Sequence, residues 1–492
     1  MAPVSCAAVM ACWKGICRIW CNWLHRARLG RPRSLSERPP SSARLREHYT
    51  LEKKLGVGAF GTVWRATSKS TGLQYAVKMV PKKDPETLQL LQREIGIMQA
   101  LEHPNVLKLL DFFEDERFYY LVVELCAGGE LLDRILQLGS FTESLASSLM
   151  KQVFSAIAYV HGQGVAHRDL KLENFLLTEG DFEEETVLLK LADFGLAQYC
   201  SAGLRTAVGS VAYAAPEVVS GNYSSACDLW SCGVILYLLL SGKQPFYGTN
   251  NREIFKQART GKYSLEDEVW KKVSADAKEL LSKLLHLDPT QRISASKALR
   301  DNWITKEVPL RRTSGTTLNF RMMEGETVLQ NLHHFAGQSR FKRTALAVIA
   351  SQMSHEKIQM LREVFSEIDS DQDGKVTMEE LYEALKDHLD QVPEDARSLL
   401  DAIDITGKGH VVYSEFVAAA IDARTDLCEE VCWNAFKHFD RNDNGSISHS
   451  ELETLLEQEA IQEIESAPGA AKTMIGEVDL DGNGKVDFDE FG

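Results

Sequence analysis

The eight residues "HRDLKLEN" (167–174) place an aspartate, a lysine and an asparagine within one short loop. The Asp169 carboxylate can accept a proton, Lys171 can neutralise a phosphate, and Asn174 can bind a metal ion. Phosphoryl transfer needs this combination, because positioning and charge neutralisation supply most of its catalysis. The stretch gains weight from the other motifs that appear in order around it.

A glycine-rich stretch and a lysine come before the loop. "LGVGAFGTVW" contains Gly56, Gly58 and Gly61, which allow a hairpin backbone to approach phosphates closely. "YAVKMV" then places Lys78 in a strand-like run, and Glu94 lies on an expected helix from which it can form an ion pair with Lys78. The glycine pattern alone is weak, but it gains weight from the motifs that follow it in order.

Two more motifs come after the loop. "DFG" provides Asp193, a second candidate for binding a metal ion, and "APE" ends at Glu217. We expect Arg292, much further along the chain, to form an ion pair with Glu217. The apolar run from Val234 to Leu240 is short enough for a buried core helix, and no run is long enough to span a membrane.

With these motifs, residues 50–304 resemble a protein kinase catalytic domain. The resemblance implies a bilobal fold, with ATP and Mg²⁺ as cofactors. It implies that Asp169 accepts the substrate hydroxyl proton, that Lys171 lies near the transferred phosphate, and that Asn174 and Asp193 hold Mg²⁺. The implied nucleotide-binding residues are Gly56, Val57, Gly58, Gly61, Val63, Ala76, Lys78 (held by Glu94), Glu124, Glu130, Asn174 and Asp193, with Val123 at the back of the adenine pocket.

Substrate preference follows from acidic residues near the catalytic loop. Glu130 and Glu173 match positions where kinases that favour basic peptides bind arginines upstream of the target residue. The alternative is that both form surface salt bridges. The chain itself contains "LRRTSG" (310–315), in which Ser314 is a candidate autophosphorylation site.

The activation segment, from Asp193 to Glu217, carries Ser210 where many kinases have threonine. Thr206 stands where relatives often have an acidic residue that pairs with Arg168. Ordering of the segment is therefore expected to depend on phosphorylation of Thr206.

The net charge of -15 is divided unevenly among three parts of the chain. Residues 1–49 hold nine Lys and Arg against two acidic residues, while residues 355–492 hold 11 basic against 34 acidic residues. The part between them is nearly neutral, so three segments with different roles are expected.

The acidic segment 355–492 contains four repeated units, each with a 12-residue loop between expected helices. Loops one, three and four match the EF-hand pattern, which surrounds one Ca²⁺ ion with oxygen atoms and makes its sharp turn at a glycine. The expected Ca²⁺-binding positions are Asp369, Asp371, Asp373, Lys375 and Glu380; Asp440, Asn442, Asn444, Ser446 and Glu451; and Asp479, Asp481, Asn483, Lys485 and Glu490.

The second loop, "DITGKGHVVYSE", is degenerate. Lys408 and Val412 stand at ligand positions, so this loop is expected to be empty or weak, although Val411 can still pair with Val376 of loop one. Gly492 follows Glu490 by only two residues, so we expect either that this end is truncated or that loop four relies on its neighbours for stability, and its affinity is left open.

The basic segment 1–49 carries Cys6, Cys12, Cys17 and Cys21 together with three tryptophans. This pattern suits a membrane surface and reversible palmitoylation; an organelle transit peptide and a disordered tail are the alternatives. The scattered cysteines favour a reducing, cytoplasmic location, and no nucleic-acid partner is expected.

Residues 339–353, "SRFKRTALAVIASQM", combine basic residues with apolar residues at helical spacing. A kinase domain followed by EF-hands resembles the calcium-dependent protein kinases of plants and protists over residues 50–492, a multidomain α+β fold with a bilobal kinase domain and an all-α EF-hand domain. In that family the junction, here 305–354, is autoinhibitory, which implies that Ca²⁺-loaded EF-hands capture the helix at 339–353. For the helix, the alternative is a permanent linker. For the whole protein, the alternatives are a constitutive kinase whose EF-hands buffer Ca²⁺ or localise the enzyme, and a Ca²⁺-binding scaffold with an inactive kinase fold.

Overall fold

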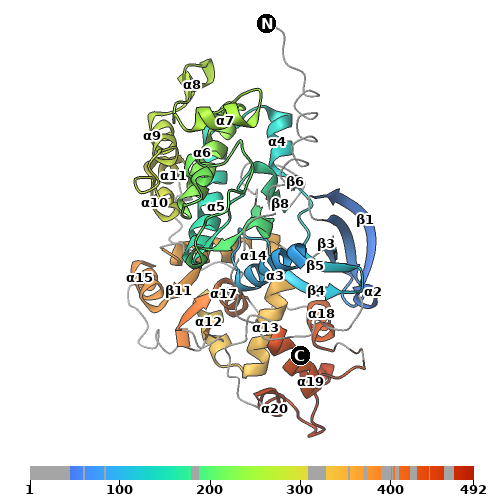
Figure 1. Cartoon of the computed structure of the whole chain (residues 1–492). Coiled ribbons are helices and arrows are strands. Elements are labelled where there is room, and N and C mark those ends of the chain that lie inside the picture. Colours follow the sequence, from blue (N-terminus) through green and yellow to red (C-terminus); the bar gives the residue numbers. More distant parts are fainter. Residues whose placement is uncertain are drawn as a thin grey trace. The chain divides into compact units, whose positions relative to one another are not determined.

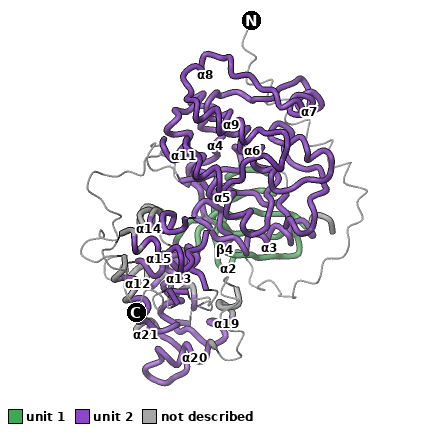
Figure 2. Tube along the Cα trace, turned by 90° about the vertical axis from the view of Figure 1, so that its left-hand side faces the viewer, with its two compact units in different colours: residues 1–69, 73–83, 110–123 green, residues 70–72, 84–109, 124–492 purple. Residues whose placement is uncertain are grey.

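The computed structural model describes residues 45–58, 61–82, 85–178, 188–307, 328–352, 355–370, 374–388, 400–401, 403–404, 409–421, 429–440, 442, 444–458 and 470–491. Several sequence predictions lie outside these residues: the N-terminal cysteines, the "LRRTSG" stretch, Met353, Asp371, Asp373 and Lys408. Figure 1 shows the described elements, and Figure 2 divides the chain into two compact units.

The smaller unit is built from residues 1–69, 73–83 and 110–123 and contains a five-stranded sheet in the order β1-β2-β3-β5-β4. Its core is apolar, with Ala66, Val77, Phe113 and Val122 buried together. The pairing of β2 with β3 places Val63 opposite Lys78, so the register of the sheet fixes the position of the lysine. The strands are β1 (Tyr49–Val57), β2 (Thr62–Ser68), β3 (Gln74–Pro81), β4 (Leu109–Glu114) and β5 (Phe118–Glu124), preceded by α2 (Leu45–His48).

The larger unit consists of residues 70–72, 84–109 and 124–492; its first helix is α3 (Pro85–Ala100), and it is mainly helical. Several of its helices start at a side chain that accepts a hydrogen bond from the first turn: Thr142 from Leu145 N at 3.2 Å, and Ser274 from Ala277 N at 3.2 Å. Its helices up to residue 307 are α4 (Leu131–Leu138), α5 (Glu143–Gly162), α6 (Ala226–Ser241), α7 (Asn251–Ala258), α8 (Glu268–Lys272), α9 (Ala275–Leu284), α10 (Ala295–Leu299) and α11 (Asn302–Glu307).

Short strands and single turns of helix hold the functional loops of this unit. β6 (Gly129–Glu130), β8 (Phe175–Leu177) and β9 (Leu189–Leu191) form one small sheet, and β7 (Val165–Ala166) pairs with β10 (Gln198–Tyr199). Strands β7 and β8 lie before and after the catalytic loop, and strands β9 and β10 lie before and after the "DFG" motif. The two sheets therefore fix both ends of each segment.

Helix α6 confirms the prediction of a core helix, because every residue from Cys227 to Leu240 is buried. In the described part of the chain, no helix is both long enough and apolar enough to cross a membrane.

The C-terminal part of the larger unit has two helices before the loops, α12 (Val328–Ala336) and α13 (Arg340–Gln352). The predicted helix at 339–353 is therefore present as α13. The remaining helices are α14 (His355–Ile368), α15 (Met378–His388), α17 (Tyr413–Ala420), α18 (Glu429–Phe439), α19 (His449–Gln458), α20 (Ala470–Gly476) and α21 (Phe488–Phe491).

This region is not purely helical, which refines the all-α prediction. Strands β11 (Lys375–Thr377) and β12 (His410–Val412) pair antiparallel, and Val376 lies opposite Val411 as expected. A second bridge joins Ile447 to Val486. The four loops therefore form two pairs, each held by a short backbone ladder.

Candidate active site and calcium loops

The catalytic loop brings Asp169, Lys171 and Asn174 together, as its spacing predicted. Lys171 Nζ lies 2.6 Å from Asp169 Oδ2, and Asn174 Nδ2 donates to the Asp169 backbone oxygen at 2.8 Å. Asp169 and Asn174 are buried, while Lys171 is half-buried. The loop thus presents a carboxylate that is paired with a cation, on a residue whose backbone oxygen is held by Asn174.

Ser210 holds the other oxygen of Asp169, a contact that the sequence analysis did not foresee. The backbone N and the hydroxyl of Ser210 both donate to Asp169 Oδ1, each at 2.8 Å. Gly209 precedes it with a φ of +100°, and a Cβ there would collide with the Arg168 carbonyl oxygen. The Ser210 hydroxyl is visible in the stretch "GSVAYAAPE", but the sequence does not indicate that it binds Asp169, which lies 41 residues away.

Asp228 holds the backbone of the catalytic loop. It is fully buried and accepts hydrogen bonds from His167 N at 2.9 Å, Arg168 N at 2.8 Å and His161 Nε2 at 2.8 Å. Burial on its own would raise the pKa of Asp228, but these donors, His161 first, hold the pKa below its ordinary value. The bonds stabilise the left-handed backbone of Arg168, which has a φ of 71°.

His167 links the loop to the "DFG" motif. Burial lowers the pKa of His167, so the ring is neutral, and Nε2 donates to the Ala192 oxygen at 3.2 Å. Its ring meets the buried Phe194 edge-on, with centroids 5.0 Å apart. Asp193 lies between these two anchors with a φ of 64°, so the aspartate is fixed by its neighbours.

In the smaller unit, the glycine-rich hairpin connects β1 with β2. Gly58 N donates to Gly61 O at 2.9 Å, and a Cβ on Gly61 would collide with the Met79 carbonyl group. Val57 is exposed, whereas Ala76 is buried in β3 beside Lys78. Lys78 and Glu94 belong to different compact units, so their ion pair stays a prediction. Gly56 and Val63 face each other in the β1–β2 ladder.

Glu173 does not form the surface salt bridge that was the alternative to substrate binding. Both of its carboxylate oxygens are buried, and neither has a hydrogen-bond partner in the described part of the chain. Burial raises the pKa of Glu173, and the nearby charges of Glu130 and Asp169 raise it further, against the lowering effect of Lys171. Glu130 itself is exposed at the end of β6. Glu124, by contrast, forms an ion pair with Lys190 at 2.9 Å.

The predicted pair between Glu217 and Arg292 is confirmed. Arg292 Nη1 and Nη2 donate to the two carboxylate oxygens at 2.6 and 3.1 Å, and Nη1 also reaches the Ala226 oxygen at 2.6 Å. The Arg292 side chain is fully buried and its guanidinium lies 5.3 Å from the Trp230 ring centroid. This pair anchors the end of the activation segment.

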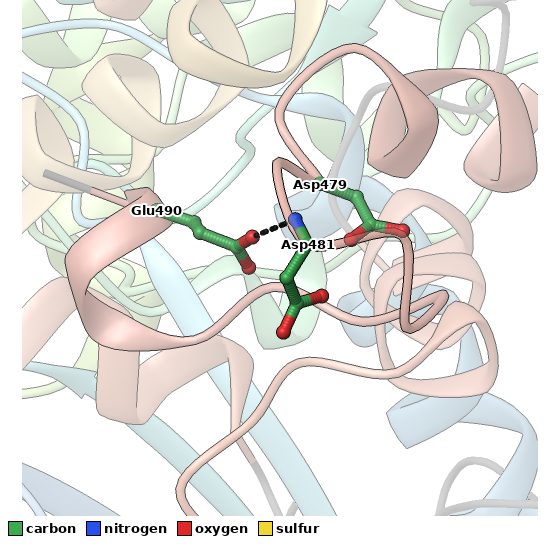
Figure 3. A group of neighbouring side chains, drawn as sticks. All are labelled: Asp479, Asp481 and Glu490. Atoms are coloured by element: carbon green, nitrogen blue, oxygen red, sulfur yellow. Dashed lines mark hydrogen bonds between the residues drawn. The ribbon is translucent and has the colours of Figure 1, made fainter.

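Loop four brings three carboxylates together. Ligand atoms of Asp479, Asp481 and Glu490 lie within 4.8 Å of one another, from two ends of a single loop (Figure 3). Gly484, with a φ of +78°, makes the turn and donates its N to Asp479 Oδ2 at 2.8 Å. Glu490 accepts from Leu480 N at 2.7 Å, which closes the loop. Such a set of hard oxygens fits Ca²⁺.

Loops one and three have the same geometry where they are described. Gly374 donates its N to Asp369 at 2.9 Å, and Gly445 donates to Asp440 at 2.7 Å. The final glutamates are held as well: Glu380 accepts from Thr377 N at 3.0 Å, and Glu451 from Ser448 N at 3.0 Å. Lys375, Ser446 and Lys485 can contribute only a backbone carbonyl oxygen or a hydroxyl at their loop position. Asn442, Asn444 and Asn483 point their amides into local hydrogen bonds.

Loop two keeps its turn and its first and last acidic residues, but not all of its ligand positions. Gly409 N donates to Asp404 at 2.6 Å, and Glu415 accepts from Val412 N at 2.9 Å. Val412 offers no side-chain oxygen, and Thr406 and Lys408 lie outside the described residues. The loop therefore keeps its turn and its strand, which supports loop one through the β11–β12 pair.

Helix α13 buries apolar side chains in both loop pairs. Phe341, Ala345 and Ile349 belong to the core of the second pair, while Ala350 belongs to the core of the first. Leu346 contacts both cores. The helix is thus shared between the two halves of the EF-hand region.

Comparison with known proteins agrees with this geometry. A protein kinase domain model matches residues 49–304, and an EF-hand domain pair model matches residues 358–421 and 429–491. Calcium-dependent protein kinase 3 of Plasmodium berghei is 38% identical over 460 residues, covering 91% of this chain and 80% of that protein. Calcium-dependent protein kinase 33 of Arabidopsis thaliana is 36% identical over 476 residues, covering 95% of this chain and 88% of that protein.

These matches cover both the kinase domain and the EF-hand region in single relatives. The cofactors expected from the sequence, ATP, Mg²⁺ and Ca²⁺, follow from the two domain types. The chain belongs to the calcium-dependent protein kinase family and is a Ca²⁺-regulated Ser/Thr protein kinase.

Proposed function

We propose that this kinase phosphorylates Ser or Thr in basic sequence contexts and that Ca²⁺ controls it through helix α13. The observation that carries the substrate preference is the buried, unpartnered carboxylate of Glu173. The observation that supports the control is the burial of α13 between the two EF-hand pairs. The two parts of the proposal can fail separately and are tested separately.

For catalysis, Asp169 is the proposed acceptor of the substrate hydroxyl proton. Lys171 and Ser210 hold its two oxygens, so the carboxylate meets the hydroxyl in one orientation without reorganising. Asn174 and Asp193 would hold Mg²⁺, and Lys78 the nucleotide phosphates. The bound metal supplies neutralisation of the phosphate charge, while the residues of the chain supply orientation and the proton acceptor.

The basic context follows from the energetics of Glu173. A buried carboxylate without a partner is costly, and an arginine guanidinium offers two parallel donors that satisfy it. Glu130 adds a second negative charge near enough to raise the pKa of Glu173. A peptide with arginine upstream of its target residue would therefore gain binding energy that a neutral peptide cannot.

The test compares two peptides that differ only by arginine or alanine at the upstream positions. Glu173→Gln should lower kcat/KM for the arginine peptide by about tenfold to a hundredfold and leave the alanine peptide nearly unchanged. Glu268→Gln, at an exposed residue of α8, is the matched control. Equal losses with both peptides would show that Glu173 supports the fold and does not recognise substrate.

For regulation, α13 carries the basic residues Arg340, Lys342 and Arg343 together with its apolar face. A basic amphipathic helix suits an apolar groove in an acidic domain, and EF-hand pairs open such a groove when they bind Ca²⁺. We therefore propose that the helix region blocks the kinase without Ca²⁺ and that the EF-hands capture it when Ca²⁺ binds.

Phosphorylation of a basic peptide, measured in MgATP with EGTA or with free Ca²⁺, tests this control. Activity should rise by about 5-fold to 150-fold with Ca²⁺. Equal activity in both conditions would support a constitutive kinase with buffering EF-hands, and no activity in either would support a scaffold.

The subcellular localisation is proposed from the sequence alone. We propose a cytoplasmic kinase that reaches membranes through palmitoylation of Cys6, Cys12, Cys17 and Cys21, all outside the described residues. Replacing the four cysteines by serine should abolish thioester-linked acylation and membrane fractionation. Mitochondrial or plastid import of the unchanged chain would favour the transit-peptide alternative.

A further inference from the structure

Helix α7 carries a row of basic side chains at the surface of the larger unit (Figure 1). Arg252, Lys256 and Arg259 follow one another at intervals of four and three residues, so they lie along one face of the helix. Arg259 comes just after the last helical residue but keeps a helical backbone, with a φ of -62° and a ψ of -20°. All three residues are exposed, and together they form what we call the basic face of α7.

The cations of the basic face have no ion-pair partners within the described residues. Glu253, the acidic residue of α7, is engaged at the start of the helix, where its carboxylate accepts hydrogen bonds from Thr249 N at 2.8 Å and Thr249 Oγ1 at 2.9 Å. An exposed lysine elsewhere in the same unit is paired, since Lys243 lies 2.6 Å from Asp267. The basic face is therefore complementary in charge to an acidic partner.

Two exposed apolar side chains border the basic face. Tyr247 is 69% exposed, and its backbone N donates to Gln257 Oε1 of α7 at 3.0 Å. Leu287 is 44% exposed and lies against the turn after α7, because a Cβ on Gly261 would collide with its side chain. Exposed aromatic and aliphatic side chains beside arginines are typical of a surface that binds another protein.

Contacts inside the larger unit connect this surface with the end of the activation segment. Phe246, the residue before Tyr247, is buried, and its ring stacks on that of Trp230 with centroids 5.4 Å apart. The other neighbour of the Trp230 ring is the Arg292 guanidinium, which holds Glu217. The activation segment in turn contacts the proposed proton acceptor. This connection favours a segment of the protein substrate over a membrane as the occupant of the surface.

We propose that the basic face of α7 binds an acidic segment of protein substrates, away from the residue that is phosphorylated. The inference rests on the proposed function and extends it, because the active site selects arginines near the target residue while α7 selects carboxylates elsewhere in the same substrate. Tyr247 and Leu287 would pack against apolar side chains within the acidic segment. A substrate held at α7 keeps its target residue at a high local concentration near the active site, so even a weak contact improves its phosphorylation.

Two synthetic substrates test this proposal with the full-length chain in saturating Ca²⁺. Each joins the same basic phosphoacceptor peptide to a second segment through a flexible Gly/Ser linker of about 20 residues, which spans about 25 Å on average. In one substrate the second segment consists of glutamate and leucine, and in the other glutamine replaces each glutamate. The glutamate substrate should have a KM about threefold to tenfold lower, with a similar kcat, and this advantage should disappear at high salt.

Charge reversal on α7 locates the contact. Lys256→Glu should reduce the advantage of the glutamate substrate about twofold or more, and adding Arg252→Glu and Arg259→Glu should abolish it. The glutamine substrate should be phosphorylated as by the unchanged chain, which also shows that these variants are folded. Lys297→Glu is the matched control, because Lys297 is likewise an exposed lysine in the last turn of a helix, α10, and it should retain the full advantage.

Equal KM values for the two substrates in the unchanged chain would overturn the proposal, as would an advantage that survives the triple charge reversal. If the triple variant instead loses only its sedimentation with phosphatidylserine vesicles, the basic face binds lipid and the proposal is wrong. Failure of the proposed function is seen separately, in the peptides that carry no second segment: the unchanged chain would then show no preference for arginine over alanine upstream of the target residue.

Discussion

Phe341 is the residue through which capture of α13 can be tested most directly. Its side chain is fully buried in the core of the second EF-hand pair. Its ring centroid lies 6.0 Å from that of Phe439 in a tilted contact and 5.9 Å from that of Phe491 in an edge-on contact. Replacing it with alanine removes both ring contacts and leaves a cavity in a core that has no other aromatic group from α13.

The size of the effect follows from these contacts. A buried Phe→Ala change costs about 3–5 kcal/mol, which weakens capture roughly a hundredfold to several thousandfold. The coupling expected between Ca²⁺ and activity is only about 1–3 kcal/mol. Because the loss exceeds the coupling, Phe341→Ala should show little or no activation by Ca²⁺.

The assay is peptide phosphorylation in EGTA and in saturating Ca²⁺, together with hydrogen exchange of the α13 amides. In Phe341→Ala, those amides should lose the protection that Ca²⁺ gives them in the unchanged chain. Phe341→Leu, which keeps most of the volume, is the matched control and should retain most of the activation. Activation by Ca²⁺ within twofold of the unchanged chain, in a folded Phe341→Ala protein, would refute capture as the source of control.

Three further predictions concern single residues. Glu490→Gln should bind one Ca²⁺ ion fewer than the unchanged chain in isothermal titration, whereas Glu415→Gln in loop two should leave the number unchanged. Arg292→Met should lower the free energy of unfolding by about 3–5 kcal/mol in urea titrations, because Glu217, whose side chain is only 12% exposed, loses its partner, and adding Glu217→Leu should recover part of the loss. Burial lowers the pKa of His103 to about 3, so below its ordinary pKa of 6.5 the unfolded chain binds a proton that the folded chain does not. Stability should fall by about 1.4 kcal/mol per pH unit as the pH drops from 6.5, and His103→Gln should flatten this slope in urea titrations at several pH values.

The contacts in the candidate site that the sequence could predict are those set by local spacing. Asp169, Lys171 and Asn174 are close in sequence, so one loop conformation brings them together, and the EF-hand turns follow from a glycine at a fixed position. The pairing of Val376 with Val411 also followed from the repeat, because EF-hand loops associate through the same position in each unit.

The parts that were missed depend on contacts between distant segments. Asp228 lies 60 residues from Arg168; the resemblance marks it as a structural position of the larger lobe, but no pattern in its own helix indicates that its carboxylate would hold the catalytic loop. Glu173 was expected either at a peptide site or in a surface salt bridge, and only the folded chain shows that its oxygens are buried.

In the proposed mechanism, Ca²⁺ binding and capture of α13 would be joined by residues that are neighbours in the chain. Phe439 directly precedes Asp440, the expected first ligand of loop three, and Phe491 directly follows Glu490, the expected last ligand of loop four. Both aromatic rings contact Phe341. In this proposal, a shift of either residue toward a bound ion would move a ring that touches the helix, so the signal would need no path longer than one peptide bond and one packed contact. The bridge between Ile447 and Val486 ties the two loops together, which explains why both would report to the same aromatic residue of α13.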